Sequence, residues 1–442
     1  MMLKFSERFR GNYTFRILPK LQNLENDPPR LQRFKKQMLN ALVKHAYAHV
    51  PYYHDLFKDM KINPNYADME KVWSKLPVLK KETVRTYHSR LVADVPSKYV
   101  VEQTSGSSGE PLKILKDRSS LSFGLASYYE GLAWYGYSFG ETMLQLWGRR
   151  PILSFRARIA RVRNNCTNLH ELDAHSMSDL MMQEYYERIL KTRPKILYGY
   201  VSSLELFSRF MLQNDYKVTV PTVVTTAEKL LGYQRKLITH AMASQVFDQY
   251  GSSEATSIAY ECPQHQGLHI MPKVILQVAR DDGEEVAPGE IGKILVTDLT
   301  NLKMPLIKYE VGDLGSKLET EQCKCGRTLE TLREVEGRTS DIIVGLNGNR
   351  VHGEFFSHLL ESSGFADKYG VKQFQLVQKT REILLFRLSV NVKPEKPALN
   401  ILNNIIGAYL GPVQVRYEFL SEIAPHVSGK YRFTISELEK NM

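Results

Sequence analysis

The chain has 442 residues, of which 43% are hydrophobic and 24% charged, and its formal net charge is +11. This composition is typical of a globular protein, and the length predicts two or three domains. The sequence has no run of 18 apolar residues, and its basic first 20 residues lack the apolar segment of a signal peptide, so we expect neither a transmembrane helix nor export. Four cysteines in so long a chain predict a reducing cytoplasmic location without a disulfide framework.

The positive charge is unevenly distributed along the chain. Residues 1–60 hold eleven Lys and Arg against five Asp and Glu, and a second basic segment, GRRPILSFRARIARVR, spans 148–163. Such segments suit nucleic acid, an anionic membrane surface or polyanions such as ATP, and a solvated face is the alternative. The sequence has no RNA-binding, zinc-finger or helix-turn-helix signature, so we expect no nucleic-acid partner. Apolar residues at helical spacing in the second segment would allow peripheral membrane contact or, alternatively, core packing.

The N-terminal part is predicted to be helical. A helix is expected over residues 30–50, ending before Pro51, and a second, short helix is expected in LPVLKKETVRTYHSRL at 76–91. One face of the first helix carries apolar residues at helical spacing: Phe34, Met38, Leu42 and Ala46.

A glycine- and serine-rich stretch, EQTSGSSGEPLKI, occupies residues 102–114. The residues on both sides are strand formers, so the pattern predicts strand, loop, strand. Such a loop is either a flexible linker or a binding site in which successive N–H groups surround a polyanion. A short connection inside a folded region favours the phosphate-binding interpretation. The loop is not a Walker motif, because Gly-Lys-Ser/Thr is absent and a strand follows.

The middle of the chain changes character near residue 215. Up to that point the pattern after the loop is mainly helical. Beyond it, a strand at 223–226, a helix at 228–243 and a strand at 245–250 form a β-α-β unit, which predicts a parallel sheet. Two further strands are expected in HIMPKVILQVAR and IGKILVTDL, on either side of the turn DDGEEVAPGE.

A domain boundary is expected near 338–345. Beyond it the pattern predicts a helix, the paired strands VKQFQLV and ILLFRLSV, another helix and another strand. We therefore expect an N-terminal domain at 1–337 and a small α+β domain at 338–442.

Three charged residues outside the glycine-rich loop are candidates for nucleotide binding. Glu254 in YGSSEA follows a predicted strand, where it would hold magnesium, or lie in a plain turn. Asp313 in a Gly-Asp turn would accept the ribose hydroxyls, and Arg338 would reach ribose or phosphate. A common turn and a surface arginine are the alternatives for these two residues.

The ordered set TSGSSGEP, VVTTAEKLL, YGSSE, EVAPGEIGKILVTDL, KYEVGDLG, EGRTSD and SGK resembles the adenylate-forming superfamily of acyl- and aryl-CoA ligases. Within it, the chain resembles the phenylacetate–CoA ligase branch and the CapK-like proteins associated with capsule biosynthesis. The resemblance spans nearly the whole chain. It implies a fold of α/β and α+β parts: a large N-terminal domain with mixed sheets and helices, and a small mobile C-terminal domain.

The resemblance also implies a reaction. A carboxylic acid would be activated by ATP as an acyl-adenylate with release of pyrophosphate, and the acyl group would then pass to CoA. The alternatives are an amine or sugar acceptor in polysaccharide biosynthesis, or a binding protein that has lost catalysis. The acid pocket would include Trp147, Tyr198 and Tyr200.

Site residues follow from the resemblance, position by position. Lys430 would stabilise charge on the reacting phosphate and carboxylate, and Glu254 would hold Mg²⁺. Tyr250 would border the adenine pocket, while Asp313 and Arg338 would hold the ribose. The phosphates would be surrounded by Thr104, Ser105, Gly106, Ser107, Ser108 and Gly109.

The cysteines suggest a second kind of site. Cys262-Pro-Gln-His265 and Cys323-Lys-Cys325 bracket a predicted hairpin. Three thiols and an imidazole suit tetrahedral zinc, with His269 as an alternative to His265. With no open position, such an ion would be structural. Ordinary reduced cysteines are the other interpretation.

Overall fold

The computed structural model describes residues 13–103, 112–147, 167–174, 177–318, 323–338, 342–352, 355–356, 359–360, 363–424 and 433–438. The glycine-rich loop at 104–109, the basic segment at 148–163 and Lys430 lie outside these residues. The chain divides into two compact units, residues 1–311 with 315–335 and residues 312–314 with 336–442. The second unit therefore begins next to the boundary expected at residue 338.

The elements up to residue 338 are mixed helices and strands. The described helices are α2 (Thr14–Gln22), α3 (Pro28–His49), α4 (Pro51–Asp59), α5 (Met69–Lys75), α6 (Lys81–Thr86), the 3-10 helix η1 (His88–Leu91), α7 (Arg118–Ala133), α9 (Asp179–Thr192), α10 (Val201–Gln213) and α11 (Gly232–Met242). The strands are β1 (Tyr99–Gln103), β2 (Lys113–Asp117), β3 (Met143–Trp147), β4 (Leu169–Asp173), β5 (Ile196–Tyr200), β6 (Thr222–Thr226), β7 (Gln245–Ser252), β8 (Thr256–Glu261), β9 (Leu268–Ile270), β10 (Val274–Ala279), β11 (Gly292–Asp298), β12 (Tyr309–Lys317) and β13 (Thr331–Arg338).

Helix α3 confirms the helix predicted at 30–50. The side chain of Asp27 accepts a hydrogen bond from the backbone N–H of Arg30, which caps the first turn. The helix ends before Pro51, which begins α4. Leu42 and Ala46 of the predicted apolar face are fully buried, so that face packs into the core.

The strand–loop–strand prediction is also confirmed on both sides of the glycine-rich loop. Strands β1 and β2 pair antiparallel, with Glu102 opposite Ile114 and Gln103 opposite Lys113.

The central sheet has eleven strands in the order β10-β11-β12-β13-β9-β8-β7-β6-β5-β3-β4. The pairs β4–β3, β3–β5, β5–β6 and β6–β7 are parallel, and the β6–α11–β7 unit confirms the predicted β-α-β motif. From β7 onward, the described pairs β7–β8, β8–β9, β9–β13 and β10–β11 are antiparallel. We call these two parts the parallel half and the antiparallel half.

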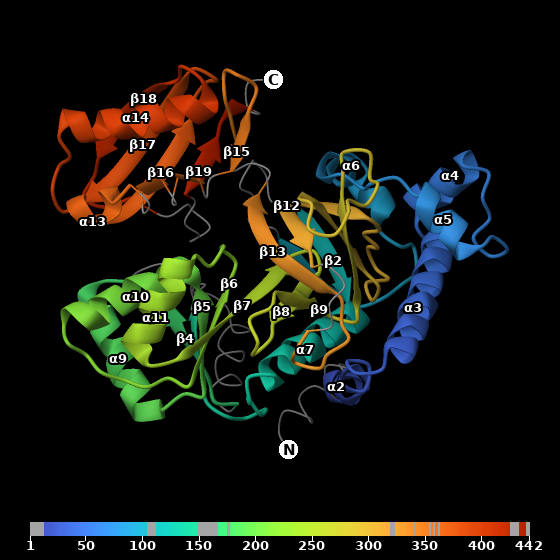
Figure 1. Cartoon of the computed structure of the whole chain (residues 1–442). Helices are drawn as coiled ribbons and strands as arrows, with labels where there is room; N and C mark the ends of the chain where they lie inside the picture. The colour runs from blue at the N-terminus through green and yellow to red at the C-terminus, as the bar shows by residue number, and fades with distance from the viewer. Residues whose placement is uncertain are drawn as a thin grey trace. The chain divides into compact units, whose positions relative to one another are not determined.

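Helices cover both faces of the parallel half. Helices α9, α10 and α11 lie side by side on one face, where they share a hydrophobic core with β3–β7 (Figure 1). Helix α7 and the residues directly after it cover the other face, with Leu132 and Tyr135 packed against Phe247 and Tyr260. A Cβ atom at Gly131 of α7 would lie 2.4 Å from the Tyr260 ring, so this close approach requires glycine.

The region between the glycine-rich loop and residue 215 is less helical than predicted. It contains three strands of the central sheet, β3, β4 and β5. Every residue of β5 is buried, and four of the five residues of β3 are buried or half-buried. A short apolar run buried on both faces has no alternation, so periodicity cannot distinguish it from a buried helical segment.

The second unit is a small α+β fold, as predicted. Its described elements are β14 (Ile342–Val344), β15 (Arg350–His352), α13 (Phe365–Tyr369), β16 (Val371–Gln378), β17 (Ile383–Val390), α14 (Lys396–Leu410), β18 (Gln414–Phe419) and β19 (Thr434–Ser436). Four strands form a sheet in the order β18-β17-β16-β19, and β16 and β17 pair antiparallel. Helix α14 buries Leu402, Ile406 and Leu410 in the core of this unit.

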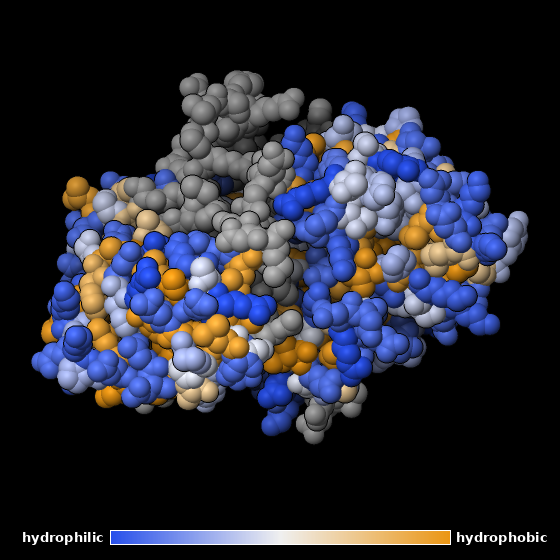
Figure 2. Space-filling view, turned by 90° about the horizontal axis from the view of Figure 1, so that it is seen from above, coloured by the Kyte–Doolittle hydropathy of each residue, from blue (hydrophilic) through white to orange (hydrophobic). Residues whose placement is uncertain are grey.

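The exposed surface is chemically mixed. In the view of Figure 2, hydrophilic residues cover much of the described surface, with smaller groups of hydrophobic residues among them. Among the described helices, none combines the length and the apolar character needed to cross a bilayer.

Candidate functional site

Three parallel strands, β3, β5 and β6, end beside Gln249 of β7 and form with it a row of side chains at the carboxyl ends of the strands. Tyr200 of β5 pairs with Thr226 of β6, which pairs with Gln249 of β7. Trp147 ends β3, and its ring centroid lies 4.5 Å from that of Tyr200. In sheets of this kind ligands bind at the carboxyl ends of the strands. We call Trp147, Tyr200, Thr226 and Gln249 the carboxyl-end row.

Hydrogen bonds fix the orientation of Gln249. Its Oε1 accepts from the Thr226 hydroxyl at 2.5 Å and from the Tyr198 hydroxyl at 2.9 Å, while its Nε2 donates to the Tyr250 carbonyl at 2.8 Å. Burial raises the pKa of Tyr198, which therefore remains a donor at neutral pH. Gln249 is 6% exposed and Trp147 is 37% exposed. The row thus combines a rigid polar group with an accessible aromatic ring.

Glu254 lies in the turn that connects β7 to β8. Its side chain is buried, and its Oε1 accepts a hydrogen bond of 3.1 Å from the Tyr309 hydroxyl of β12. Burial and the nearby Glu254 carboxylate both raise the pKa of Tyr309, so the hydroxyl keeps its proton. Carboxylate oxygens are suitable Mg²⁺ ligands, and one carboxylate together with substrate phosphates is a common arrangement. The oriented Glu254 carboxylate fits that role.

Two buried lysines near this turn and the glycine-rich loop were missed by sequence reasoning. Lys273 Nζ donates to the Ala255 carbonyl at 2.5 Å and lies 3.4 Å from Asp298 Oδ2, so it holds the residue next to Glu254. Burial lowers its pKa, and the Asp298 carboxylate opposes this effect. Lys116 Nζ lies 2.7 Å from Glu102 Oε2, and the two residues flank the loop. In the sequence, each of these lysines lies in or next to an apolar strand pattern, and this position is the signal that could have indicated a buried, paired lysine.

The other predicted nucleotide residues are distributed between the two units. Tyr250 is 9% exposed and packs in a hydrophobic cluster with Ala255 and Ile258. Asp313 lies in β12 after Gly312, whose φ of +86° favours glycine, and belongs to the second unit. Arg338 is the last residue of β13. The structure therefore brings Tyr250 and Glu254 to the carboxyl-end row through one strand and its turn.

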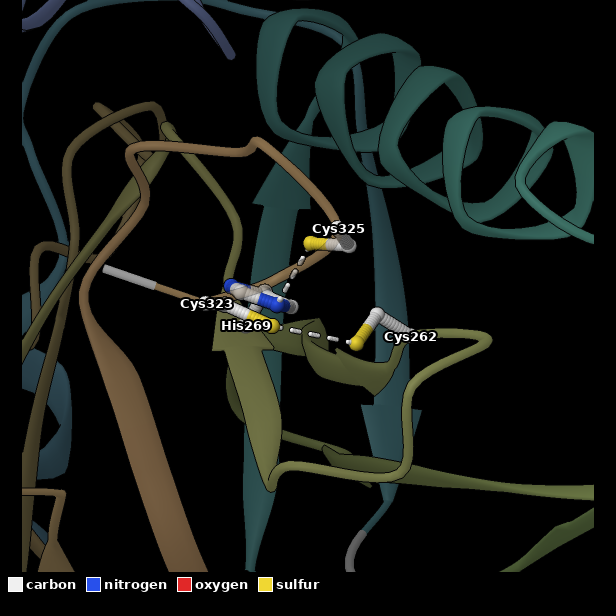
Figure 3. A group of neighbouring side chains, drawn as sticks. All are labelled: Cys262, His269, Cys323 and Cys325. Atoms are coloured by element: carbon white, nitrogen blue, oxygen red, sulfur yellow. Dashed lines mark hydrogen bonds between the residues drawn. The ribbon is translucent and has the colours of Figure 1, made fainter. Parts of the chain in front are cut away.

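The antiparallel half holds a cluster of three cysteines and one histidine. The ligand atoms of Cys262, His269, Cys323 and Cys325 all lie within 4.8 Å of one another. The Cys262 and Cys323 sulfurs are 3.5 Å apart, and the Cys325 sulfur is 3.4 Å from His269 Nε2. Figure 3 shows the sulfur atoms and the imidazole ring gathered together. We call these four residues the Cys₃His cluster.

The histidine of this cluster is the alternative residue, His269, and not His265. Strand β9 carries His269 and pairs with β13. Strand β13 follows the segment that holds Cys323 and Cys325, so the pairing brings His269 close to these cysteines. His265 instead has its Nδ1 2.9 Å from Glu261 Oε1 and 3.3 Å from Arg235 Nη1. Strand register thus selects His269. Burial lowers the pKa of His269 to about 4, so its imidazole is neutral at pH 7.

Known proteins with similar sequences match the second unit and most of the whole chain. The family described as the CapK C-terminal domain matches residues 343–437. The chain is 26% identical over 349 residues to the phenylacetate–coenzyme A ligase of Thermus thermophilus, covering 74% of each chain. It is 21% identical over 421 residues to the protein CapK of Staphylococcus aureus, covering 92% of this chain and 88% of that one. A shorter match, 27% over 142 residues and about a third of each chain, is to the indoleacetate–lysine synthetase of Pseudomonas savastanoi.

A solved structure shares the fold over almost the whole chain. The 2-hydroxyisobutyryl-CoA ligase, in its postadenylation state with an acyl-adenylate, matches with a TM-score of 0.74 at 17% identity, over 95% of this chain and 92% of that one. The fold is therefore that of the adenylate-forming ligases. In sequence, the chain is similar to the phenylacetate–CoA ligases and to CapK.

Proposed function

We propose that this protein joins a carboxylic acid to coenzyme A in two half-reactions. In the first, a carboxylate oxygen attacks the α-phosphorus of ATP, the bond to the bridging oxygen breaks, and pyrophosphate leaves. In the second, the thiol of CoA loses its proton, its sulfur attacks the acyl carbon, and AMP leaves. The likeness to phenylacetate–CoA ligase and the fold shared with an acyl-CoA ligase support this activity.

The observation that carries the proposal is the carboxyl-end row together with Glu254. The acid would lie against Trp147 and Tyr200, whose rings offer an apolar contact, with the fixed Gln249 amide beside them. Glu254, held by Tyr309, would hold Mg²⁺, which supplies neutralising charge to the nucleotide phosphates. The acid and the nucleotide would thus meet at the end of β7.

The remaining nucleotide contacts are proposed from the resemblance to the adenylate-forming ligases. The loop at 104–109 would surround the phosphates, with Tyr250 at the adenine. Asp313 and Arg338 would hold the ribose. Lys430 in the second unit would place its ammonium group on the reacting phosphate and carboxylate, with that unit acting as a mobile lid. We also propose a cytoplasmic location, because the proposed reaction uses ATP and CoA.

A second candidate keeps the adenylate but changes the acceptor to an amine or a sugar hydroxyl. The similarity to indoleacetate–lysine synthetase supports an amine acceptor. The matches to CapK and to its C-terminal domain support an acceptor in polysaccharide biosynthesis. In either case the nucleophile would attack the acyl carbon, lose a proton and release AMP.

Pyrophosphate exchange into ATP, measured across a panel of carboxylic acids, tests the first half-reaction. Exchange that depends on the acid supports the adenylate, and product masses with CoA, amines or sugars then identify the acceptor. A protein that binds ATP but exchanges pyrophosphate with no acid of the panel would instead be a binding protein.

The Lys430→Ala variant separates the two half-reactions. Loss of one charge-stabilising contact typically lowers the rate by about 10²–10³. Acyl-adenylate formation should fall by that factor, whereas transfer from synthetic acyl-adenylate should remain, because the lid would then be turned away. Equal loss of both halves would contradict the proposed lid movement.

A further inference from the structure

The Cys₃His cluster has the dimensions of a tetrahedral zinc site. With Zn–S near 2.3 Å and Zn–N near 2.0–2.1 Å, neighbouring ligand atoms are about 3.6–3.8 Å apart in a tetrahedron. The Cys262–Cys323 sulfur separation is 3.5 Å and the Cys325–His269 separation is 3.4 Å. All four ligand atoms lie within 4.8 Å of one another, and each residue offers one (Figure 3). Small shifts would therefore complete the tetrahedron.

The environment of His269 leaves the correct nitrogen available for a metal. Its Nδ1 lies 3.2 Å from the Thr331 hydroxyl, which donates to the Leu329 carbonyl at 3.3 Å. The Thr331 oxygen can then accept from Nδ1–H, which leaves the Nε2 lone pair directed at the cysteines. A metal-binding histidine commonly has such a hydrogen-bonding partner on its other nitrogen.

The residues that follow Cys325 contact two segments far away in the sequence, the end of α2 and the end of α7. Arg327 Nε lies 3.2 Å from Glu25 Oε2, and the Arg327 guanidinium stacks 4.2 Å from the centroid of the Trp134 ring. Thr328 donates from its N–H and its hydroxyl to the Glu25 carbonyl, at 2.8 and 2.9 Å. Trp134 Nε1 donates to Glu25 Oε1 at 2.8 Å. Glu25, which follows α2, is thus held from two sides.

We infer that Cys262, His269, Cys323 and Cys325 bind one structural zinc ion, and that this ion fixes the Cys323–Thr328 segment as a clasp on Glu25. Four protein ligands fill a tetrahedral shell, so the ion has no position for substrate. Without the ion, three thiols and an imidazole would be held together only by weak hydrogen bonds. The segment that holds Glu25 would then loosen. This inference is independent of the reaction proposed above.

Zinc content in a matched set of variants tests the metal site. Protein purified without chelator should contain about one zinc per chain by elemental analysis. Cys323→Ser and His269→Gln should lose it, whereas His265→Gln should retain it, because His265 contacts Glu261 and Arg235 instead. Absence of zinc in the wild-type protein, or its loss in His265→Gln but not in His269→Gln, would overturn the site.

A measurement on the unmodified chain covers the case in which the variants do not fold. Titration with a mercurial reagent in the presence of a zinc-binding dye should release about one zinc per chain as the thiols react. Cobalt substitution should give the absorption bands of tetrahedral thiolate coordination. A disulfide between Cys262 and Cys323 in freshly purified protein would contradict the inference.

Limited proteolysis tests the clasp. Removal of zinc by a chelator should increase cleavage between residues 22 and 30 about tenfold or more, because local opening exposes backbone in proportion to its population. Restored protection on adding zinc supports the clasp. Complete loss of zinc with unchanged cleavage in this segment would overturn the clasp even if the metal site itself is correct.

Discussion

The two halves of the central sheet bring distant residues together in different ways. In the parallel half, β3, β5 and β6 end beside Gln249 of β7, so strand register alone places Trp147, Tyr200, Thr226 and Gln249 in a row. In the antiparallel half, neighbouring strands end at opposite edges, and the Cys₃His cluster assembles from β9 and the loops beside β8 and β13.

The two ways of assembling a site suit two kinds of chemistry, binding of a substrate in the parallel half and binding of a structural metal ion in the antiparallel half. A row at the end of parallel strands leaves an edge that loops and ligands can cover, and Trp147 is still 37% exposed there. The Cys₃His cluster is closed, since its ligands face one another and Cys262 and His269 are fully buried. Glu254 lies between the two halves, in the turn from β7 to β8. The catalytic proposal therefore depends on the junction, whereas the zinc proposal depends on the antiparallel half alone.

The largest expected effect comes from breaking the junction. Glu254→Gln removes the proposed Mg²⁺ ligand and should lower acid-dependent pyrophosphate exchange by about 10²–10³. Tyr309→Phe removes only the hydrogen bond that orients Glu254, and should lower exchange by about tenfold, in line with a hydrogen bond to a charged group. Raising the Mg²⁺ concentration should partly rescue Tyr309→Phe but not Glu254→Gln. Unchanged zinc content in both variants serves as the control.

A smaller effect is expected where α7 crosses the sheet. Gly131→Ala would place a Cβ atom 2.4 Å from the Tyr260 ring, so the helix or the ring must move. Such overpacking typically lowers the free energy of unfolding by about 1–3 kcal/mol, which chemical denaturation measures. Gly136→Ala is an unsuitable control because its φ is +75°, whereas Gly232→Ala in α11 has no atom near the added carbon and should be neutral or stabilising. Equal stability of Gly131→Ala and wild type would show that the contact adjusts freely.

The smallest expected effect concerns pH and the face of α7 near Glu25. Burial, with the neighbouring Glu25, raises the pKa of Glu130 to about 9. The folded protein thus keeps a proton that the unfolded chain releases near pH 4.5, so the free energy of unfolding falls as pH rises from about 4.5 to about 9. Glu130→Gln removes this dependence. Because local relaxation absorbs part of such a shift, we expect a gain of about 1 kcal/mol at pH 9 and almost none at pH 4.

Thermal unfolding of the wild-type protein and of Glu130→Gln at pH 4, 7 and 9 measures the difference in their stability. A stability gain that is the same at all three pH values would mean that Glu130 does not change its protonation in that range.

Much of the fold was predictable because its signals are local. The apolar face of α3, the β6–α11–β7 unit and the β16–β17 pair were all predicted from periodicity and turn residues. Strands β3, β4 and β5 were not. Strand β5 is buried along its whole length and so shows no alternation, and β3 and β4 are five-residue strands whose burial follows no regular period. The fold class and the resemblance to the adenylate-forming ligases were recognised from the order of several short motifs rather than from any one of them.

The sequence by itself determined which residue types were available: the glycine-rich loop, Glu254, Asp313, Lys430, Cys262 and the Cys323–Cys325 pair. Only the tertiary structure decided which side chains from other strands contact these residues. Tyr309 reaches Glu254 and Lys273 reaches the Ala255 carbonyl because β12 and β10 return to the end of β7. Likewise, the pairing of β9 with β13 selects His269 over His265. Spacing along the chain fixes which side chains share a strand or turn, but only strand register and burial determine which side chains from different strands meet.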